Sequence, residues 1–464
     1  MKHVLNRLTA IYFFLLIAIS FSTTSSADFA LAMKYYEQKD FQKAYHEFLE
    51  AAEYGDYSSQ YNIGAMYYRG DFVEKNLIEA YAWFFLSAQD PNSGTRQVHT
   101  SIYKKLSPEE KQKAEKRYEE INAEYGDDAI EKKLTPVFLG GTPLLKKFRL
   151  IKTVAPDYPM QMAQRGSFGW VDMLFTIEKD GTTKDHVVYS SPHQAFTDAA
   201  IKSARQSLFE PLKINGKPVT VTGVKRRYIF EMAGTSFNKK RITAAMQEMK
   251  EKAIKGDDRD KLGYAYFLDS IPSFAQIDDI KDNPNKWYME AANSGNAAAS
   301  FFLGQNILYG NMCTADSSIS MGWLIKAATN NITDAQYTLA IELMSGARFE
   351  RNEEKALYWL QRAAASSTAA QLRYAWILTT HPSAEKRDGA LAKTYLDMVD
   401  KGYHDKQTLF QVAAAVAAEN NDFKAAIDWQ TKALKDARGL ELPLDYVNQR
   451  LAAYNNKQPW REAL

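Results

Sequence analysis

The fold of this chain is decided by three related stretches: Trp287-Tyr-Met-Glu-Ala-Ala, Trp323-Leu-Ile-Lys-Ala-Ala and Trp359-Leu-Gln-Arg-Ala-Ala. Their tryptophans are 36 residues apart, and one more step of 36 reaches Tyr395, with Trp429 following after 34. A period of this length, with apolar residues at helical spacing, indicates stacked pairs of helices.

An earlier copy of the pattern lies near the start of the chain. The stretches Ala44–Ala52 and Ala80–Ala88 are offset by the same 36 residues. A single helical hairpin buries only part of its apolar surface, and the next hairpin covers the rest. Alanines at fixed positions let the helices approach closely, and the aromatic residue fills the wedge between hairpins. We therefore expect a mainly α-helical fold, a helical-hairpin solenoid.

These repeats resemble the Sel1-like repeat, a relative of the tetratricopeptide repeat (TPR). The resemblance covers about 28–90 and 250–445. In that family the solenoid is a platform for protein interactions rather than a catalytic site. The matching stretches are Asp56-Tyr-Ser-Ser-Gln-Tyr-Asn-Ile-Gly-Ala-Met-Tyr-Tyr-Arg-Gly70 with Asn76-Leu-Ile-Glu-Ala-Tyr-Ala-Trp83, and Asp334-Ala-Gln-Tyr-Thr-Leu-Ala with Asn352-Glu-Glu-Lys-Ala-Leu-Tyr-Trp359.

The repeat is interrupted between about 134 and 232 by a different pattern. Val171, Met173, Phe175 and Ile177 alternate along one face, which predicts a half-buried strand. A tight turn at 179–181 leads into the next strand. The expected elements are a helix at 158–165, strands at 168–178 and 185–189, a helix at 196–209, and a strand at 219–232 with a bulge at Gly223.

This interrupting unit is similar to the TonB C-terminal domain over about 150–233. The resemblance implies an inserted α+β domain of order αββαβ, with a three-stranded antiparallel sheet. It also implies that the last strand lies at the sheet edge and accepts an extended peptide from an outer-membrane transporter. The shared residues are Tyr158-Pro159, Ala163, Gly166, Gly169, Val171, Asp180-Gly181, Ser190-Ser191, Ala199-Ala200, Ala204-Arg205, Phe209-Glu-Pro211 and Gly216-Lys-Pro-Val219.

The last strand supplies the candidate binding site. An edge strand presents unpaired N–H and C=O groups with which a second chain can pair. Its basic residues would favour an acidic peptide, although basic residues on an edge also commonly block unwanted pairing. Both interpretations stay open. The predicted partner-binding residues are Val224, Lys225, Arg226, Arg227, Tyr228, Ile229 and Phe230.

The N-terminus has the pattern of a secretory signal. Basic residues precede the apolar run Ala10–Phe21, and small residues follow up to Ala27. The run is short beside the roughly 20 apolar residues of a membrane-spanning helix. We expect cleavage after Ala27. The predicted segments are a signal peptide at 1–27, Sel1-like repeats with a charged helix at 28–132, a linker at 133–149, the TonB-like domain at 150–233, and Sel1-like and TPR-like repeats at 234–464.

Composition and motifs argue against several classes of function. The 58 basic and 56 acidic residues nearly cancel, so charge gives no reason to expect nucleic acid or an anionic membrane as partner. The single cysteine, Cys313, is expected to be a partly buried small apolar residue in a loop. His186 and His193 are expected at surface or turn positions, without metal-ligand spacing. We therefore predict no enzyme, no metal, no cofactor and no small-molecule substrate.

Three functional interpretations remain at this stage. The first is a periplasmic interaction scaffold whose partners are envelope proteins, outer-membrane transporters among them. The second is an energy transducer anchored in the inner membrane, with the solenoid replacing the proline-rich spacer of TonB. Only 14 prolines occur in the chain, and the TonB-like unit is internal, so this second interpretation is disfavoured. The third is an enzyme built in the groove of the solenoid.

Overall fold

The computed structural model describes residues 27–90, 97–139, 148–167, 169–214, 216–231, 239–270, 282–399, 403 and 405–462. The predicted signal peptide, apart from its final residue, lies outside these ranges, so its cleavage stays a prediction. No helix of the described residues combines the length and apolar character that a bilayer crossing requires.

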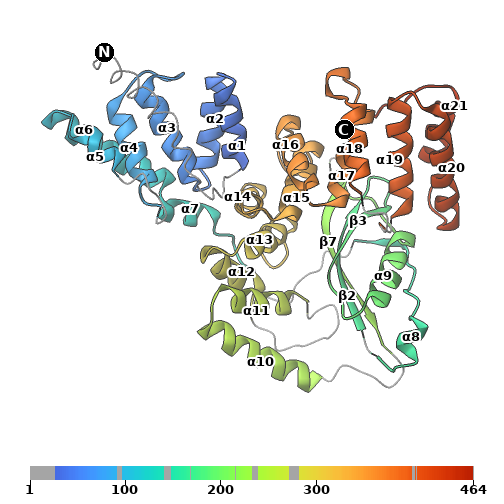
Figure 1. Ribbon diagram of the computed structural model, residues 1–464. Coiled ribbons are helices and arrows are strands. Elements are labelled where there is room, and N and C mark those ends of the chain that lie inside the picture. The colour runs from blue at the N-terminus through green and yellow to red at the C-terminus, as the bar shows by residue number, and fades with distance from the viewer. Residues whose placement is uncertain are drawn as a thin grey trace, which may run out of the picture.

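In its described residues, the N-terminal array contains two helical hairpins followed by three further helices (Figure 1). Phe48 and Trp83 are buried in its core. The charged helix begins as its sequence predicts, because Ser107 and Glu110 cap each other's backbone N–H groups in a capping box. The helices are α1 (Ala27–Glu37), α2 (Phe41–Ala52), α3 (Tyr57–Arg69), α4 (Leu77–Ser87), α5 (Val98–Tyr103), α6 (Pro108–Tyr125) and α7 (Asp127–Leu134).

The C-terminal array is the longer one and curves around the inserted domain (Figure 1). Trp323 and Trp359 are buried between its hairpins, whereas Trp287 is half-buried against Tyr264 near the start of the array. The stacked hairpins expected around the tryptophans are thus present. The helices are α10 (Lys239–Lys255), α11 (Asp258–Ser270), α12 (Pro284–Asn293), α13 (Ala297–Tyr309), α14 (Ser317–Thr329), α15 (Thr333–Ser345), α16 (Glu353–Ala364), α17 (Thr368–Thr380), α18 (Gly389–Asp397), α19 (Lys406–Glu419), α20 (Phe423–Gly439) and α21 (Asp445–Asn455).

The N-terminal array docks against the side of the C-terminal array, at α14 and α16, instead of extending the stack. Leu134 at the end of α7 shares a core with Trp323, whose indole N–H donates to the Leu134 carbonyl at 2.8 Å. On α16, the buried Lys355 pairs with Glu47 at 2.9 Å and Glu50 at 2.6 Å. The predicted linker at 133–149 contributes to this docking, because 137–139 pair with the loop between α13 and α14.

The inserted domain has the predicted αββαβ order. Its antiparallel sheet runs β3-β2-β7, so β7 lies at an edge. Gly223 has φ +63° at a register shift in β7, which confirms the expected bulge. The main elements are α8 (Met160–Ala163), β2 (Gly169–Ile177), β3 (Thr183–Ser190), α9 (Gln194–Gln206) and β7 (Val221–Phe230). Short strand pairs join β1 (Leu150–Lys152) to β4 (Leu208–Phe209) and β5 (Lys213–Ile214) to β6 (Lys217–Pro218).

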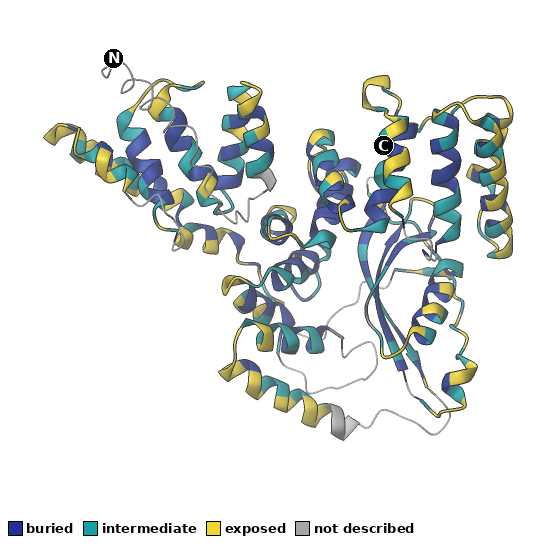
Figure 2. Cartoon of the chain, in the orientation of Figure 1, coloured by how far each residue is buried: buried dark blue, intermediate teal, exposed yellow. Residues whose placement is uncertain are grey.

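The prediction that strand 168–178 is half-buried was wrong, because both faces of β2 are covered (Figure 2). Val171 and its alternate neighbours pack in the domain's own core, where α9 contributes Phe196. On the opposite face, Leu174 enters the core formed by α13 to α17. The inner side of the C-terminal array therefore replaces solvent over this face of the sheet.

Candidate functional site

The candidate site begins at the outer edge of β7. Within the described part of the chain, the backbone ladder of β7 runs only to β2, and its other edge has no strand beside it. Residues 224–230 therefore occupy the edge position that the sequence predicts. Because edge N–H and C=O groups lack ladder partners, they can pair with an added strand.

A cavity of about 620 Å³ lies along this edge, and we name it the edge groove. Its volume falls within the roughly 300–1,000 Å³ that is typical of ligand sites. The floor is formed by Gly223, Val224, Lys225 and Arg226 of β7. One side, the aromatic wall, comprises Phe148, Leu150, Phe175 and Phe209, with Arg149 beside it. The other side, the amide wall, comprises Gln305, Asn306 and Tyr309 of α13 together with Asn311.

The three basic residues of β7 have different surroundings. Lys225 forms an ion pair with Asp269 of α11, with Nζ and Oδ2 2.5 Å apart. Arg227 forms a two-pronged ion pair with Asp172 of β2. Both cations are thus held by carboxylates of this chain.

Arg226 is the basic residue of β7 that the groove leaves available. Its guanidinium lies over the rings of Tyr228 and Phe209, at 4.7 and 6.0 Å from the ring centres. Its Nη1 is buried and has no hydrogen-bond partner among the described residues. The expected preference for an acidic peptide therefore depends on Arg226 rather than on all three cations.

The remaining predicted site residues do not line the groove. Tyr228 and Phe230 are buried in the core of the inserted domain, and Ile229 is half-buried. The side chains that the structure brings to the groove are those of Val224, Lys225 and Arg226. Residues 227–230 contribute their edge position on the strand, and their side chains support the domain.

The amide wall was not predicted from the sequence. Gln305 is 2% exposed and donates through Nε2 to Thr338 at 2.9 Å, while its Oε1 has no partner among the described residues. Asn311 donates through Nδ2 to Asp269 at 3.0 Å, and its Oδ1 is likewise unpartnered. Two buried acceptors therefore lie on one side of the groove.

The bulge in β7 brings the strand close to this wall. A Cβ atom at Gly223 would lie 2.6 Å from the side-chain amide of Gln305, so a larger residue would displace that amide, and the φ of +63° also favours glycine. The Tyr309 hydroxyl donates to the Thr222 carbonyl at 2.5 Å. These contacts fix the spacing between β7 and α13.

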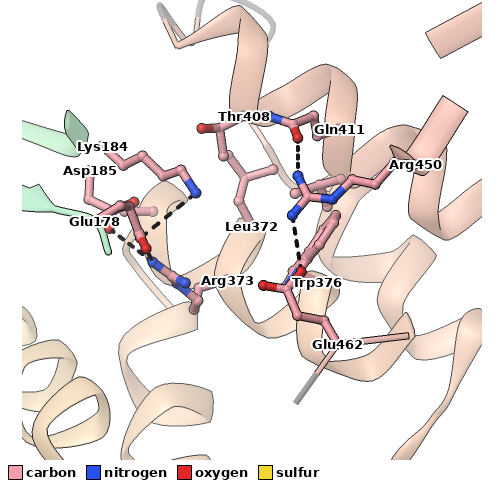
Figure 3. Close-up of a pocket in the computed structure, with 12 residues that line it drawn as sticks. Glu178, Lys184, Asp185, Leu372, Arg373, Trp376, Thr408, Gln411, Arg450 and Glu462 are labelled. Atoms are coloured by element: carbon pink, nitrogen blue, oxygen red, sulfur yellow. Dashed lines mark hydrogen bonds and ion pairs between the residues drawn. The ribbon is translucent and has the colours of Figure 1, made fainter. Parts of the chain in front are cut away.

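A second interface between domain and array lies at the β2–β3 turn, and we name it the clamp (Figure 3). Glu178 forms an ion pair with Arg373 of α17, and Lys184 lies 3.7 Å from the same carboxylate. Asp185 accepts a hydrogen bond from Tyr337 of α15 at 2.5 Å and lies 3.9 Å from Arg373. The adjoining cavity of about 70 Å³ is too small for a peptide.

The clamp carboxylates show how burial competes with charge. Burial alone would raise the pKa of Glu178, but the adjacent Arg373 and Lys184 cations lower that pKa to about 2. Burial raises the pKa of Asp185, because the more distant Arg373 compensates for it only in part. Glu178 is therefore held as a carboxylate by its partners.

Other candidates for chemistry have structural surroundings. Cys313 is buried in the loop between α13 and α14, as expected, and burial raises the pKa of its thiol to about 12. His193 accepts from the Ala195 N–H at the start of α9. His186 is buried against Thr183, contrary to its expected surface position, because α9 covers this part of β3. In the described ranges, no group of His, Cys, Asp and Glu side chains is placed to hold a metal ion.

Comparison with protein families identifies both components of the chain. The model of the Gram-negative bacterial TonB protein C-terminal matches 154–232. The Sel1 repeat model matches 58–92, 297–332 and 333–367. Comparison with curated proteins finds no match.

Two of the solved structures that are similar to the chain are repeat proteins. One is a Sel1 repeat protein from Oxalobacter formigenes, with 19% identity, a TM-score of 0.35, and coverage of 49% of this chain and 66% of that protein. The other is a protective antigen present in uropathogenic Escherichia coli strains displaying an SLR fold. It has 16% identity, a TM-score of 0.35, and coverage of 89% of this chain and 78% of that protein.

Proposed function

Since the chain carries a TonB C-terminal-like domain inserted among Sel1 repeats, we propose that it is a periplasmic scaffold that binds extended peptides of envelope proteins. The peptide pairs with the outer edge of β7 inside the edge groove. Outer-membrane transporters are the proposed class of partner. Both components are protein-interaction modules, so the proposal involves no catalytic step.

One observation carries this proposal: the open edge of β7 forms the floor of a cavity of about 620 Å³ with a wall on each side. An added strand would gain main-chain hydrogen bonds from the edge and side-chain contacts from the walls. An edge that served only to block pairing would not need a cavity of this size beside it.

The proposed location rests on the N-terminal signal pattern. Mass measurement of the mature protein from the envelope fraction tests it. A chain that begins at Asp28 is expected. A membrane-bound chain that retains the segment before Ala27 would favour the alternative, an energy transducer anchored in the inner membrane.

Selection from a display library of twelve-residue peptides tests the binding site. The full chain is compared with Leu150→Trp, which places a large side chain in the groove from β1. The matched control is Ile151→Trp, because the neighbouring side chain in β1 is 62% exposed and does not line the groove. Thermal melting checks that both variants fold.

The wild-type chain and Ile151→Trp are expected to enrich the same peptides, and Leu150→Trp is expected to lose them. Equal enrichment by all three proteins would contradict binding in the groove. Failure of the wild-type chain to enrich any peptide would contradict the proposed function itself.

A further inference from the structure

We propose that α13 of the Sel1 array supplies half of the peptide site, and that the groove selects a strand in which apolar residues alternate with polar ones and one apolar-side position is acidic. This inference rests on the proposed function. It assigns the specificity to Arg226, Gln305 and Asn311.

The two walls differ in chemistry, and this difference predicts a peptide whose residues alternate between apolar and polar. Successive side chains of a strand point to opposite faces. A strand added to β7 would therefore send alternate side chains toward the aromatic wall and toward the amide wall. The aromatic wall accepts apolar side chains, whereas the amide wall offers hydrogen-bonding groups.

Arg226 predicts the acidic position of the peptide. Its guanidinium lies over Phe209, which belongs to the aromatic wall, and its Nη1 has no partner among the described residues. A carboxylate on the apolar side of the peptide would complete this donor. Lys225 and Arg227 cannot substitute, because Asp269 and Asp172 already hold them.

Two acceptors on the amide wall predict hydrogen-bond donors on the polar side of the peptide. Within the part of the chain that the structure describes, Gln305 Oε1 and Asn311 Oδ1 are buried and unpartnered on the amide wall. A buried polar atom without a hydrogen bond costs about 1–3 kcal/mol. Hydroxyl or N–H donors on the polar side of the peptide would satisfy both atoms.

Three blocked heptapeptides and one small molecule test the inference by calorimetric titration of the full chain. In the first peptide, threonine occupies the odd positions, and valine, glutamate and valine occupy the even positions in that order. The second has lysine in place of glutamate. The third has the composition of the first with its valines adjacent, which destroys the alternation. N-acetylglutamate amide tests whether a small anion alone suffices.

The first peptide is expected to bind at least about tenfold more tightly than the other two, the size of effect that one charge-assisted hydrogen bond gives. Arg226→Gln should remove the preference for glutamate over lysine, and Arg226→Glu should reverse it. Gln305→Leu should weaken the first peptide severalfold. Arg259→Gln is the matched control, because Arg259 is exposed at the start of α11, and it should change nothing.

Each contrary outcome has one meaning. Equal binding of the three peptides, or a glutamate preference that survives Arg226→Gln, overturns the inference, while the proposed function stands if the display library still yields groove-dependent peptides. If none of the heptapeptides binds, the inference is likewise overturned, and the proposed function again depends on the result of the display library. N-acetylglutamate amide binding as tightly as the first peptide would make the groove a small-molecule site and overturn the inference.

Discussion

The inserted domain meets the C-terminal array in two contrasting regions, the clamp and the edge groove. In the clamp, Glu178, Asp185 and Arg373 partner one another or Tyr337, around a cavity of about 70 Å³. Along the edge groove, the cavity is about 620 Å³, and its walls carry buried polar atoms without partners. The same two components thus meet around a small cavity in one place and around a much larger cavity in the other.

This contrast separates structural contacts from binding contacts. A buried charge is tolerated in a fold when its partners are fixed, as they are in the clamp. A buried polar atom that remains unpartnered lowers stability unless water or a ligand completes its hydrogen bonds. The clamp contacts join the inserted domain to α15 and α17 of the array.

The largest expected effect comes from breaking the clamp. Arg373→Met would leave Asp185 buried without a cation and Glu178 with only Lys184, which should lower the free energy of unfolding by about 3–5 kcal/mol. Urea unfolding followed by tryptophan fluorescence measures the change. The control Arg351→Met removes an arginine whose side chain is 52% exposed, and it should cost less than about 1 kcal/mol. Equal effects of the two substitutions would remove the distinction between clamp and surface.

A pH titration sharpens the account of the clamp. The pKa of Glu178 is about 2 in the folded chain, below its ordinary value of 4.5. The ionised Glu178 carboxylate therefore stabilises the fold by about 3 kcal/mol above pH 4.5, and this stabilisation is lost as the pH falls toward 2. The difference in unfolding free energy between wild type and Glu178→Gln should shrink over that range. A difference that stays constant with pH would show that Glu178 is not held as a carboxylate.

Two neighbouring cations in β7 should differ in their effect on stability. Lys225→Met leaves the buried Asp269 without its cation and should cost about 1–3 kcal/mol, whereas Arg226→Met removes no ion pair and should cost less than about 1 kcal/mol. Chemical unfolding of the two variants side by side measures both values. If Arg226→Met proved the more destabilising, Arg226 would be a structural residue and not a free contact in the groove.

The sequence predicted the elements because they depend on local periodicity. The spacing of Trp287, Trp323 and Trp359 is sufficient to identify stacked hairpins, and the alternation in 168–178 identifies a strand. The edge position of 224–230 followed from the resemblance to the TonB C-terminal domain. The bulge at Gly223 was predicted because glycine in a strand commonly marks one.

The second face of β2 could not be read from the sequence. Asp172 is polar and therefore suggests solvent on that face, but it is buried with Arg227 and Tyr266 as partners. A polar residue whose partner comes from a distant helix looks the same in a sequence as one that faces water. This is why the strand was expected to be half-buried.

The amide wall was missed for a related reason. Gln305 lies 82 residues after Gly223 in the sequence, and their contact depends on the curvature of the whole C-terminal array. No local pattern encodes that curvature. The different roles of Lys225, Arg226 and Arg227 were missed as well, because they depend on carboxylates brought in by tertiary packing.

The central claim is that a peptide pairs with the outer edge of β7. Hydrogen–deuterium exchange tests this claim most directly when the full chain is measured with and without a saturating peptide from the display library. The account predicts that the peptide slows exchange of the amides at 223–227 in β7 and leaves exchange of the β3 amides at 183–190 unchanged, because the groove lies along β7 and not along β3. Unchanged exchange in β7, or equal slowing in both strands, would contradict it.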